Sequence, residues 1–361
     1  VTPSGTPMTK SADAETIELD DTDPEAWNDY ALAQGWSDGL PMVPPTEERV
    51  ARFTNVVKAD NETFAPISPR LVVPTLKSLA ANAVMAGCKP EYFPAVLAGL
   101  RAVPAPAYNL HGTLATTHPC GQLMMVSGPI RKMLDINCGS NCLGQGRRAN
   151  ATIGRALQIV LLNVGGAKPG GMDPANIAVE TDEHLAWRPA TFPFCLGKKG
   201  EGSPFPPFHV RRGFEAGESV VTVMAAEAPH NINDHASNTG EGLVMMIAGT
   251  MSQVGANNTY LKGPSFVVLG PEHAQTLARD GWTAESLQEA LFERSRIHVS
   301  RLSKENLESW EGQGRHPVND HYYLNNSAQD LNVVVAGGAG KHSVYIPSFG
   351  NTAAISTRIN L

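Results

Sequence analysis

The sequence predicts an α/β fold in which helices pack in layers on a mixed sheet. Hydrophobic residues make up 42% of the 361 residues, as in globular proteins. Short apolar runs alternate with longer stretches of helical periodicity, which is the pattern of layered α/β proteins. A Gly/Pro-rich stretch interrupts this alternation once. We therefore expect two subdomains, with a flexible tail over 1–20, an N-terminal half over 21–170, an irregular excursion over 171–215 and a C-terminal half over 216–361.

The N-terminal half begins with helices. Asp23-Pro24-Glu25 combines an N-cap, a first-turn proline and an acid, so a helix starts here and ends near Gly35. Further helices are expected over 46–53, 75–87 and 91–100. The apolar run 123–126 predicts a buried strand, and the periodicity of 148–164 predicts a long helix.

The C-terminal half alternates strands with helices. The strands are expected over 219–224, 264–269 and 331–336. Helices are expected over 241–251, from Gly270-Pro271-Glu272 onward, and over 283–296.

Composition limits the classes of function. The net charge is −7, from 28 basic and 35 acidic residues, which argues against a nucleic-acid binder. The sequence contains no run of 18 apolar residues that could span a membrane, and no secretory signal is visible. The five cysteines are an odd number, so we expect reduced thiols and a cytoplasmic location. Charged residues are only 17%, which favours an oligomer that hides part of its surface.

The strongest chemical signal is a Gly/Asn/Cys-rich segment, 137–150, that leads into the predicted helix. Free N–H groups at a helix N-terminus suit a carboxylate or a phosphate. The helix field also lowers a thiol pKa, so Cys142 is the expected thiolate and Cys138 the second catalytic candidate. A tight loop with incidental small cysteines would have the same composition. The expected contacts to an anionic substrate are Gly144, Gly146, Arg147, Arg148 and Asn150.

Histidines gather in two other segments. His111 and His118 lie close to Cys120, before the first predicted strand. His230, Asp234 and His235 follow the strand 219–224, where the loops of α/β proteins often carry catalytic groups. We expect His118 or His230 to transfer protons, with Asp234 orienting a histidine. Backbone-bonded loops, or a helix cap by Asn233 or Asp234, are the structural alternatives.

A glycine-rich turn, 337–343, follows the last predicted strand. It is not a phosphate loop of the GxxxxGK[ST] type, because Val335 replaces the first glycine and His342 the hydroxyl residue. Lys341 and His342 are still candidates for holding an anion over the backbone amides. The alternative is a glycine turn required for packing.

Several segments together resemble a known family. They are Gly35–Pro41 with Val43–Thr46, Val84–Tyr92, Arg148–Ala156 and Val335–His342. They resemble a largely uncharacterised bacterial family associated with partners that carry a Sec/Cys-Gly-Ser-Cys motif, the UGSC proteins. The resemblance spans about residues 36–350. This chain has Cys138-Gly139-Ser140-Asn141-Cys142 instead of the contiguous tetrad, so it resembles the companion chain.

The resemblance implies an activity and a partner. The UGSC motif is similar to the selenocysteine motif of glycine-reductase-type proteins. It therefore implies thiol-dependent or reductive cleavage of a carbon–heteroatom bond, together with a UGSC-type partner chain.

Three hypotheses follow. The first is a thiol-dependent enzyme or enzyme subunit, an oxidoreductase or lyase, that acts on a small anionic substrate. The second is a metal-dependent hydratase, lyase or hydrolase with a transition metal held by His111, His118, His230 and His235. The third is a non-catalytic partner subunit in a homo- or hetero-oligomer.

Overall fold

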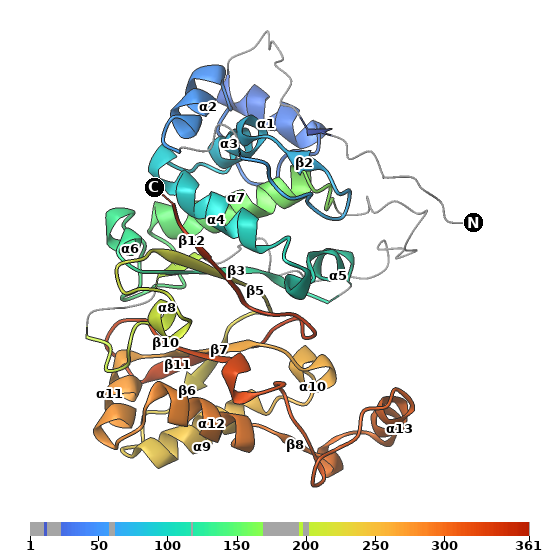
Figure 1. Cartoon of the computed structure of the whole chain (residues 1–361), viewed down its shortest axis with the longest axis vertical. Coiled ribbons are helices and arrows are strands. Elements are labelled where there is room, and N and C mark those ends of the chain that lie inside the picture. The colour runs from blue at the N-terminus through green and yellow to red at the C-terminus, as the bar shows by residue number, and fades with distance from the viewer. Residues whose placement is uncertain are drawn as a thin grey trace.

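The chain forms four layers, with two sheets face to face and helices on the outer face of each (Figure 1). The structure is a computed structural model that describes residues 11–12, 23–57, 62–116, 118–168, 195–197 and 202–360. Each sheet has four strands, and both mix parallel with antiparallel pairs. The predicted α/β class is confirmed.

The first sheet has the strand order β12–β5–β3–β4. Its strands are β3 (Gly121–Ser127), β4 (Cys195–Gly197), β5 (Val220–Ala226) and β12 (Ile355–Arg358). The helices on its outer side are α1 (Pro24–Ala33), α2 (Glu47–Thr54), α3 (Leu76–Met85), α4 (Phe93–Ala102) and α7 (Arg148–Asn163). Strands β5 and β12 come from beyond residue 216, so both predicted halves of the chain build this sheet.

The second sheet has the strand order β10–β7–β11–β6. Its strands are β6 (His230–Asn233), β7 (Ser265–Leu269), β10 (Leu331–Val335) and β11 (His342–Ile346). Helices α9 (Gly240–Met251), α11 (Pro271–Arg279) and α12 (Ala284–Arg294) cover its outer face.

Short elements complete the described chain. Those before the first sheet are β1 (Ser11–Ala12), β2 (Val73–Pro74), η1 (Pro90–Tyr92), η2 (Pro106–Tyr108) and α5 (Leu110–Ala115). Those further along are α6 (Ile130–Met133), α8 (Phe208–Arg211), α10 (Asn257–Leu261), β8 (Ile297–His298), η4 (Val299–Arg301), α13 (Lys304–Gly312), β9 (His321–Tyr322) and η5 (Ala328–Asp330).

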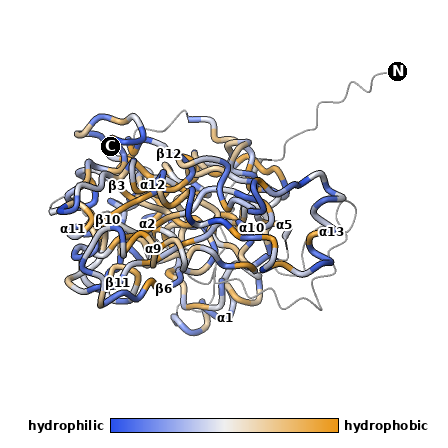
Figure 2. Tube along the Cα trace, turned by 90° about the horizontal axis from the view of Figure 1, so that it is seen from below, coloured by the Kyte–Doolittle hydropathy of each residue, from blue (hydrophilic) through white to orange (hydrophobic). Residues whose placement is uncertain are grey.

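The four layers explain why the strands are continuous apolar runs. Successive side chains of a strand point to opposite faces, and here both faces are covered. Met124 and Val126 of β3 point into the core beneath the helices, whereas Leu123 and Met125 point toward the second sheet. Hydrophobic segments accordingly gather inside the molecule, and hydrophilic ones lie at its periphery (Figure 2).

Four of the eight strands in the two large sheets were not predicted. β4 lies in the predicted excursion, β6 falls in the segment 229–235 interpreted as a loop, β11 begins at the end of the glycine turn 337–343, and β12 lies near the C-terminus. Much of the predicted excursion, 171–194, lies outside the described residues. Its later part contains β4 and α8. In the described ranges, every helix is too short or too polar to cross a membrane.

Candidate functional site

Two of the predicted loops meet at one end of the sheets. The cysteine loop (residues 137–146) follows β3 and α6, and the glycine loop (residues 336–341) joins β10 to β11. The Gly337 N–H donates a hydrogen bond of 2.9 Å to the Cys138 carbonyl oxygen. A Cβ atom at Gly338 would overlap Ser140 Oγ and lie 3.0 Å from Ser140 Cα. The two loops are therefore in direct backbone contact.

The two cysteines of this loop have different surroundings. Arg131 Nη1 donates to Cys138 Sγ at 3.0 Å, so a guanidinium faces this thiol. Cys142 packs in the apolar core between the sheets. Burial, reinforced by the charge of Cys138, raises the pKa of Cys142.

The expected lowered pKa of Cys142 is therefore wrong. Cys142 lies before the start of α7 at Arg148, and its side chain is in the core and not over the helix N-terminus. Because a nearby positive charge stabilises a thiolate, Cys138 is the better thiolate candidate.

Asn150, in the first turn of α7, fixes the path of the cysteine loop. Its Oδ1 accepts a hydrogen bond of 2.7 Å from the Asn137 N–H. Its Nδ2 donates to the carbonyl oxygens of Asn137 at 3.0 Å and of Cys142 at 3.4 Å. The side chain is buried. Its part in the site is to position the loop.

Asn150→Ala is expected to lower the free energy of unfolding by about 2 kcal/mol, because buried backbone groups lose their partners. Alkylation of Cys142 should become faster, since the loop opens more often. Urea unfolding and peptide mapping after iodoacetamide treatment measure the two effects. Asn326→Ala, at an exposed position, is the control. Unchanged stability and labelling would contradict this role.

The expected anion contacts have other partners. Arg148 donates to the carbonyl oxygens of Gly87 at 2.8 Å and Cys88 at 3.3 Å, which ties α7 to the turn after α3. Arg147 forms an exposed ion pair with Asp135. Gly144 and Gly146 serve the turns of the loop: a Cβ at Gly144 would overlap the Asn141 side chain, and Gly146 has a φ of +112°. The prediction of a ready-made anion site at this helix is therefore not supported by these contacts.

A pair of exposed histidines lies beside the glycine loop. His342 Nδ1 is 3.0 Å from Asn231 Oδ1, and its Nε2 is 3.1 Å from His235 Nε2. Because an amide oxygen only accepts, Nδ1 of His342 carries a proton and its Nε2 accepts from His235 when both rings are neutral. Lys341 Nζ donates to the His235 carbonyl oxygen at 3.0 Å. His235 and His342 therefore form a hydrogen-bonded pair at the surface.

Asp234 does not orient any of the predicted histidines. Its Oδ1 accepts from the N–H groups of Ala236 and Ser237 and closes a turn. The helix-cap alternative is wrong for Asp234, because Thr239 caps the next helix, α9. Burial acts to raise its pKa, but these hydrogen bonds and the charge of His273 outweigh it and lower the pKa. The Asp234 carbonyl oxygen is 3.0 Å from Nε2 of the buried His273. Asp234 is thus an ionised group that shapes its own turn.

His118 lies at the opposite end of β3 from the cysteine loop. Its Nε2 is 2.9 Å from Glu227 Oε1, which also accepts from the Asn257 N–H at 3.0 Å. Its Nδ1 is buried without a hydrogen-bond partner. His118 and Glu227 form a dyad of the kind used for general base chemistry, but it belongs to a separate site.

The four histidines of the metal hypothesis do not converge. His118 is at one end of the sheets, His235 pairs with His342 near the other, and His111 and His230 are exposed. Over the part of the chain that the structure describes, no three His, Cys, Asp or Glu residues are arranged to hold a metal ion.

Four important residues were missed in the sequence. Glu227 is 109 residues from His118, so no local pattern indicates it. Arg131 is seven residues from Cys138, but this spacing matches no known motif. Arg211 and Arg212 are adjacent, and this pair in a Gly/Pro-rich stretch was a usable signal.

Comparison with known proteins identifies no relative of this chain. No protein-family model, no curated protein and no solved structure matches this chain.

Proposed function

We propose that this chain is a thiol-dependent enzyme, or the subunit of one, that uses Cys138 as a nucleophilic thiolate on a small substrate. The observation that carries the proposal is the 3.0 Å contact between Arg131 Nη1 and Cys138 Sγ. A guanidinium favours the thiolate over the thiol, and the thiolate is the reactive form. The resemblance to the UGSC-associated family favours cleavage of a carbon–heteroatom bond.

The chemistry proceeds in two balanced steps. The Cys138 thiolate attacks the substrate carbon and forms a C–S bond, while the heteroatom leaves with the electron pair of the broken bond. Cys142 then loses its proton and attacks the Cys138 sulfur, which forms a disulfide and releases the carbon as a carbanion that takes up a proton. The dithiol supplies the two electrons, and a dithiol partner chain reduces the disulfide for the next cycle.

The surroundings of Cys142 support its place in the second step. Its raised pKa keeps it protonated at rest, so it does not compete with Cys138 for the substrate. Both cysteines lie in the cysteine loop, and the charge of Cys138 adds to the raised pKa of Cys142. His235 and His342 lie at the end of the glycine loop that contacts Cys138, and we assign them the exchange of protons with solvent.

The test is alkylation of the folded protein by iodoacetamide over a range of pH, with peptide mapping. Cys138 is expected to react first and to keep reacting below neutral pH. Cys88, whose pKa burial raises to about 12, should stay unlabelled until far higher pH. Arg131→Gln should slow the labelling of Cys138 at neutral pH about tenfold, since a thiolate loses its charged partner.

Two results would overturn the proposal. One is labelling of Cys138 no faster than that of Cys88 at neutral pH. The other is an Arg131→Gln variant that labels like the native protein. Arg301→Gln, which removes an exposed guanidinium on η4, controls for the change of net charge.

We also propose that the chain works in a reducing compartment, the cytoplasm, and in an oligomer or with a UGSC-type partner. The low charged fraction and the exposed Met245 and Met246 on α9 support an additional interface. Light scattering on the purified chain measures its oligomeric state, and a monomer that binds no Cys-Gly-Ser-Cys protein would contradict the assembly.

A further inference from the structure

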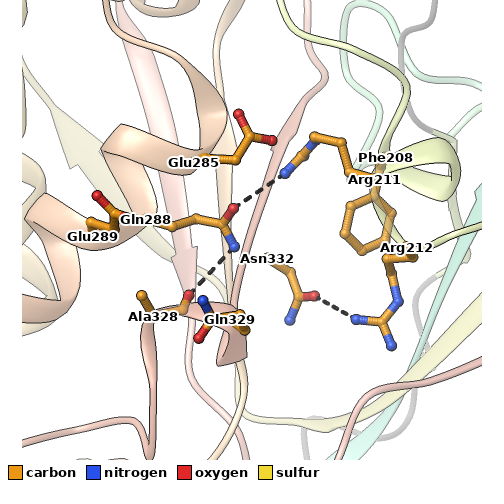
Figure 3. A pocket seen from close by; sticks show the side chains of 9 residues that line it. All are labelled: Phe208, Arg211, Arg212, Glu285, Gln288, Glu289, Ala328, Gln329 and Asn332. Atoms are coloured by element: carbon orange, nitrogen blue, oxygen red, sulfur yellow. Dashed lines mark hydrogen bonds between the residues drawn. The ribbon is translucent and has the colours of Figure 1, made fainter.

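A pocket of about 410 Å³, lined mostly by polar and charged residues, lies beside the edge strand β10, away from the cysteine loop. Helix α8 forms one wall, helix α12 the opposite wall, and η5 with β10 the floor (Figure 3). Its lining residues are Phe208, Arg211, Arg212, Glu285, Gln288, Glu289, Ala328, Gln329 and Asn332. This volume suits a small molecule.

Arg212 holds one side of the pocket in place. Its Nε donates to Ser356 Oγ at 2.7 Å, its Nη1 to Asn332 Oδ1 at 3.2 Å and its Nη2 to the Ala354 carbonyl oxygen at 2.7 Å. These contacts join α8 to the edge strands of both sheets. All three acceptors are neutral, so the charge of this guanidinium is not compensated by them.

Arg211 has a less complete set of partners. Its Nη2 donates to the Val333 carbonyl oxygen, and its Nη1 reaches Gln288 Oε1 only at 3.5 Å. Its Nε is buried and has no hydrogen-bond partner. The two walls thus leave a charged donor of Arg211 unsatisfied beside the pocket.

Neither arginine forms an ion pair in the described part of the chain. Burial lowers the pKa of Arg211 and of Arg212. For Arg211, the charge of Glu285 across the pocket opposes this shift and the charge of Arg212 adds to it. Two desolvated guanidinium groups that form no close ion pair are unfavourable, and an anion held between them would stabilise both. A carboxylate matches the fork of a guanidinium in shape and charge.

The opposite wall carries the opposite charge. Glu285 and Glu289 lie one turn apart on α12 and are exposed at the pocket. Like charges at this spacing destabilise a helix, and a cation between them would relieve the repulsion. Gln288 and Asn332 supply neutral amide groups between the two charged walls (Figure 3).

We propose that this pocket binds a small zwitterion of the free amino-acid class, with its carboxylate at Arg211 and Arg212 and its ammonium group at Glu285 and Glu289. The separation of one positive wall from one negative wall selects a molecule that carries both charges. This proposal does not rest on the thiol chemistry, because none of the lining residues belongs to the cysteine loop or the glycine loop.

The test is a thermal-shift and calorimetric screen of the full chain against the common α-amino acids. Each amino acid is compared with the carboxylic acid that lacks its amino group and with the amine that lacks its carboxylate. At least one amino acid is expected to bind and raise the melting temperature, whereas the matched acid and amine should bind more weakly. Failure of every amino acid to bind would overturn the proposal.

Two variants locate the binding. Arg211→Gln and Glu285→Gln should each weaken the binding of that amino acid about tenfold or more, because each removes one charged partner. Arg301→Gln and Glu305→Gln, at exposed positions outside the pocket, are the matched controls. Affinity that is unchanged in Glu285→Gln would overturn the proposal even if Arg211→Gln failed to fold.

Discussion

Phe266→Ala is expected to lower the free energy of unfolding by about 4 kcal/mol, because it opens a cavity between the two sheets. Phe266 on β7 is fully buried and belongs to the cluster that both sheets share. Its ring packs edge-on against Phe208 of α8, with the centroids 5.6 Å apart. Loss of the ring therefore weakens both the contact between the sheets and the packing of α8 against β7.

Urea unfolding followed by circular dichroism and by fluorescence measures this loss. Leu32→Ala, which truncates an exposed leucine on α1, is the control and should leave stability nearly unchanged. The two probes should give one common transition in the native protein, because the sheets share one core cluster. A loss below about 1 kcal/mol for Phe266→Ala would mean that the two sheets are not held together by this cluster.

The local elements could be predicted because their signals are strong and lie close together in the sequence. Asp23 caps α1 as expected, with its Oδ2 accepting from the N–H groups of Glu25 and Ala26. Helix α7 extends from Arg148 to Asn163, close to the predicted bounds. Their apolar spacing alone indicates a helix with one buried face.

The unpredicted strands lack such a signal. β6 reads His-Asn-Ile-Asn, and only Ile232 is buried. β12 is an edge strand with intermediate or exposed side chains. Backbone pairing with a neighbour stabilises these strands, and the partner cannot be seen in the strand's own sequence. The division into two sheets was missed for the same reason.

The site was predictable as a set of loops and not as a set of contacts. The cysteine loop and the glycine loop were both identified, and they do meet. The choice of Cys142 over Cys138 failed because it relied on distance along the chain to the helix start. Arg131, which distinguishes the two thiols, is visible only when α6 and the loop fold together.

Gly338→Ala should then have a large effect, because it forces the two loops apart. The new Cβ would overlap Ser140 Oγ and lie 3.0 Å from Ser140 Cα, so the Gly337 to Cys138 hydrogen bond could not form unchanged. The expected loss of stability is about 3 kcal/mol, at the upper end for overpacking. Cys138 should move relative to Arg131, and its labelling by iodoacetamide at neutral pH should slow.

Gly139, which precedes Ser140 in the cysteine loop, is the control for this experiment. A Cβ at Gly139 meets only Asn137 Oδ1, at the ordinary distance of 3.6 Å, so Gly139→Ala should fold and label like the native protein. Ser140→Gly removes the atoms that collide most severely with the new methyl group, so the double variant with Gly338→Ala should recover much of the loss. Additive losses in the double variant would show that the collision does not cause the effect. Recovery of stability together with recovery of Cys138 labelling would tie the reactivity of this thiol to the contact between the two loops.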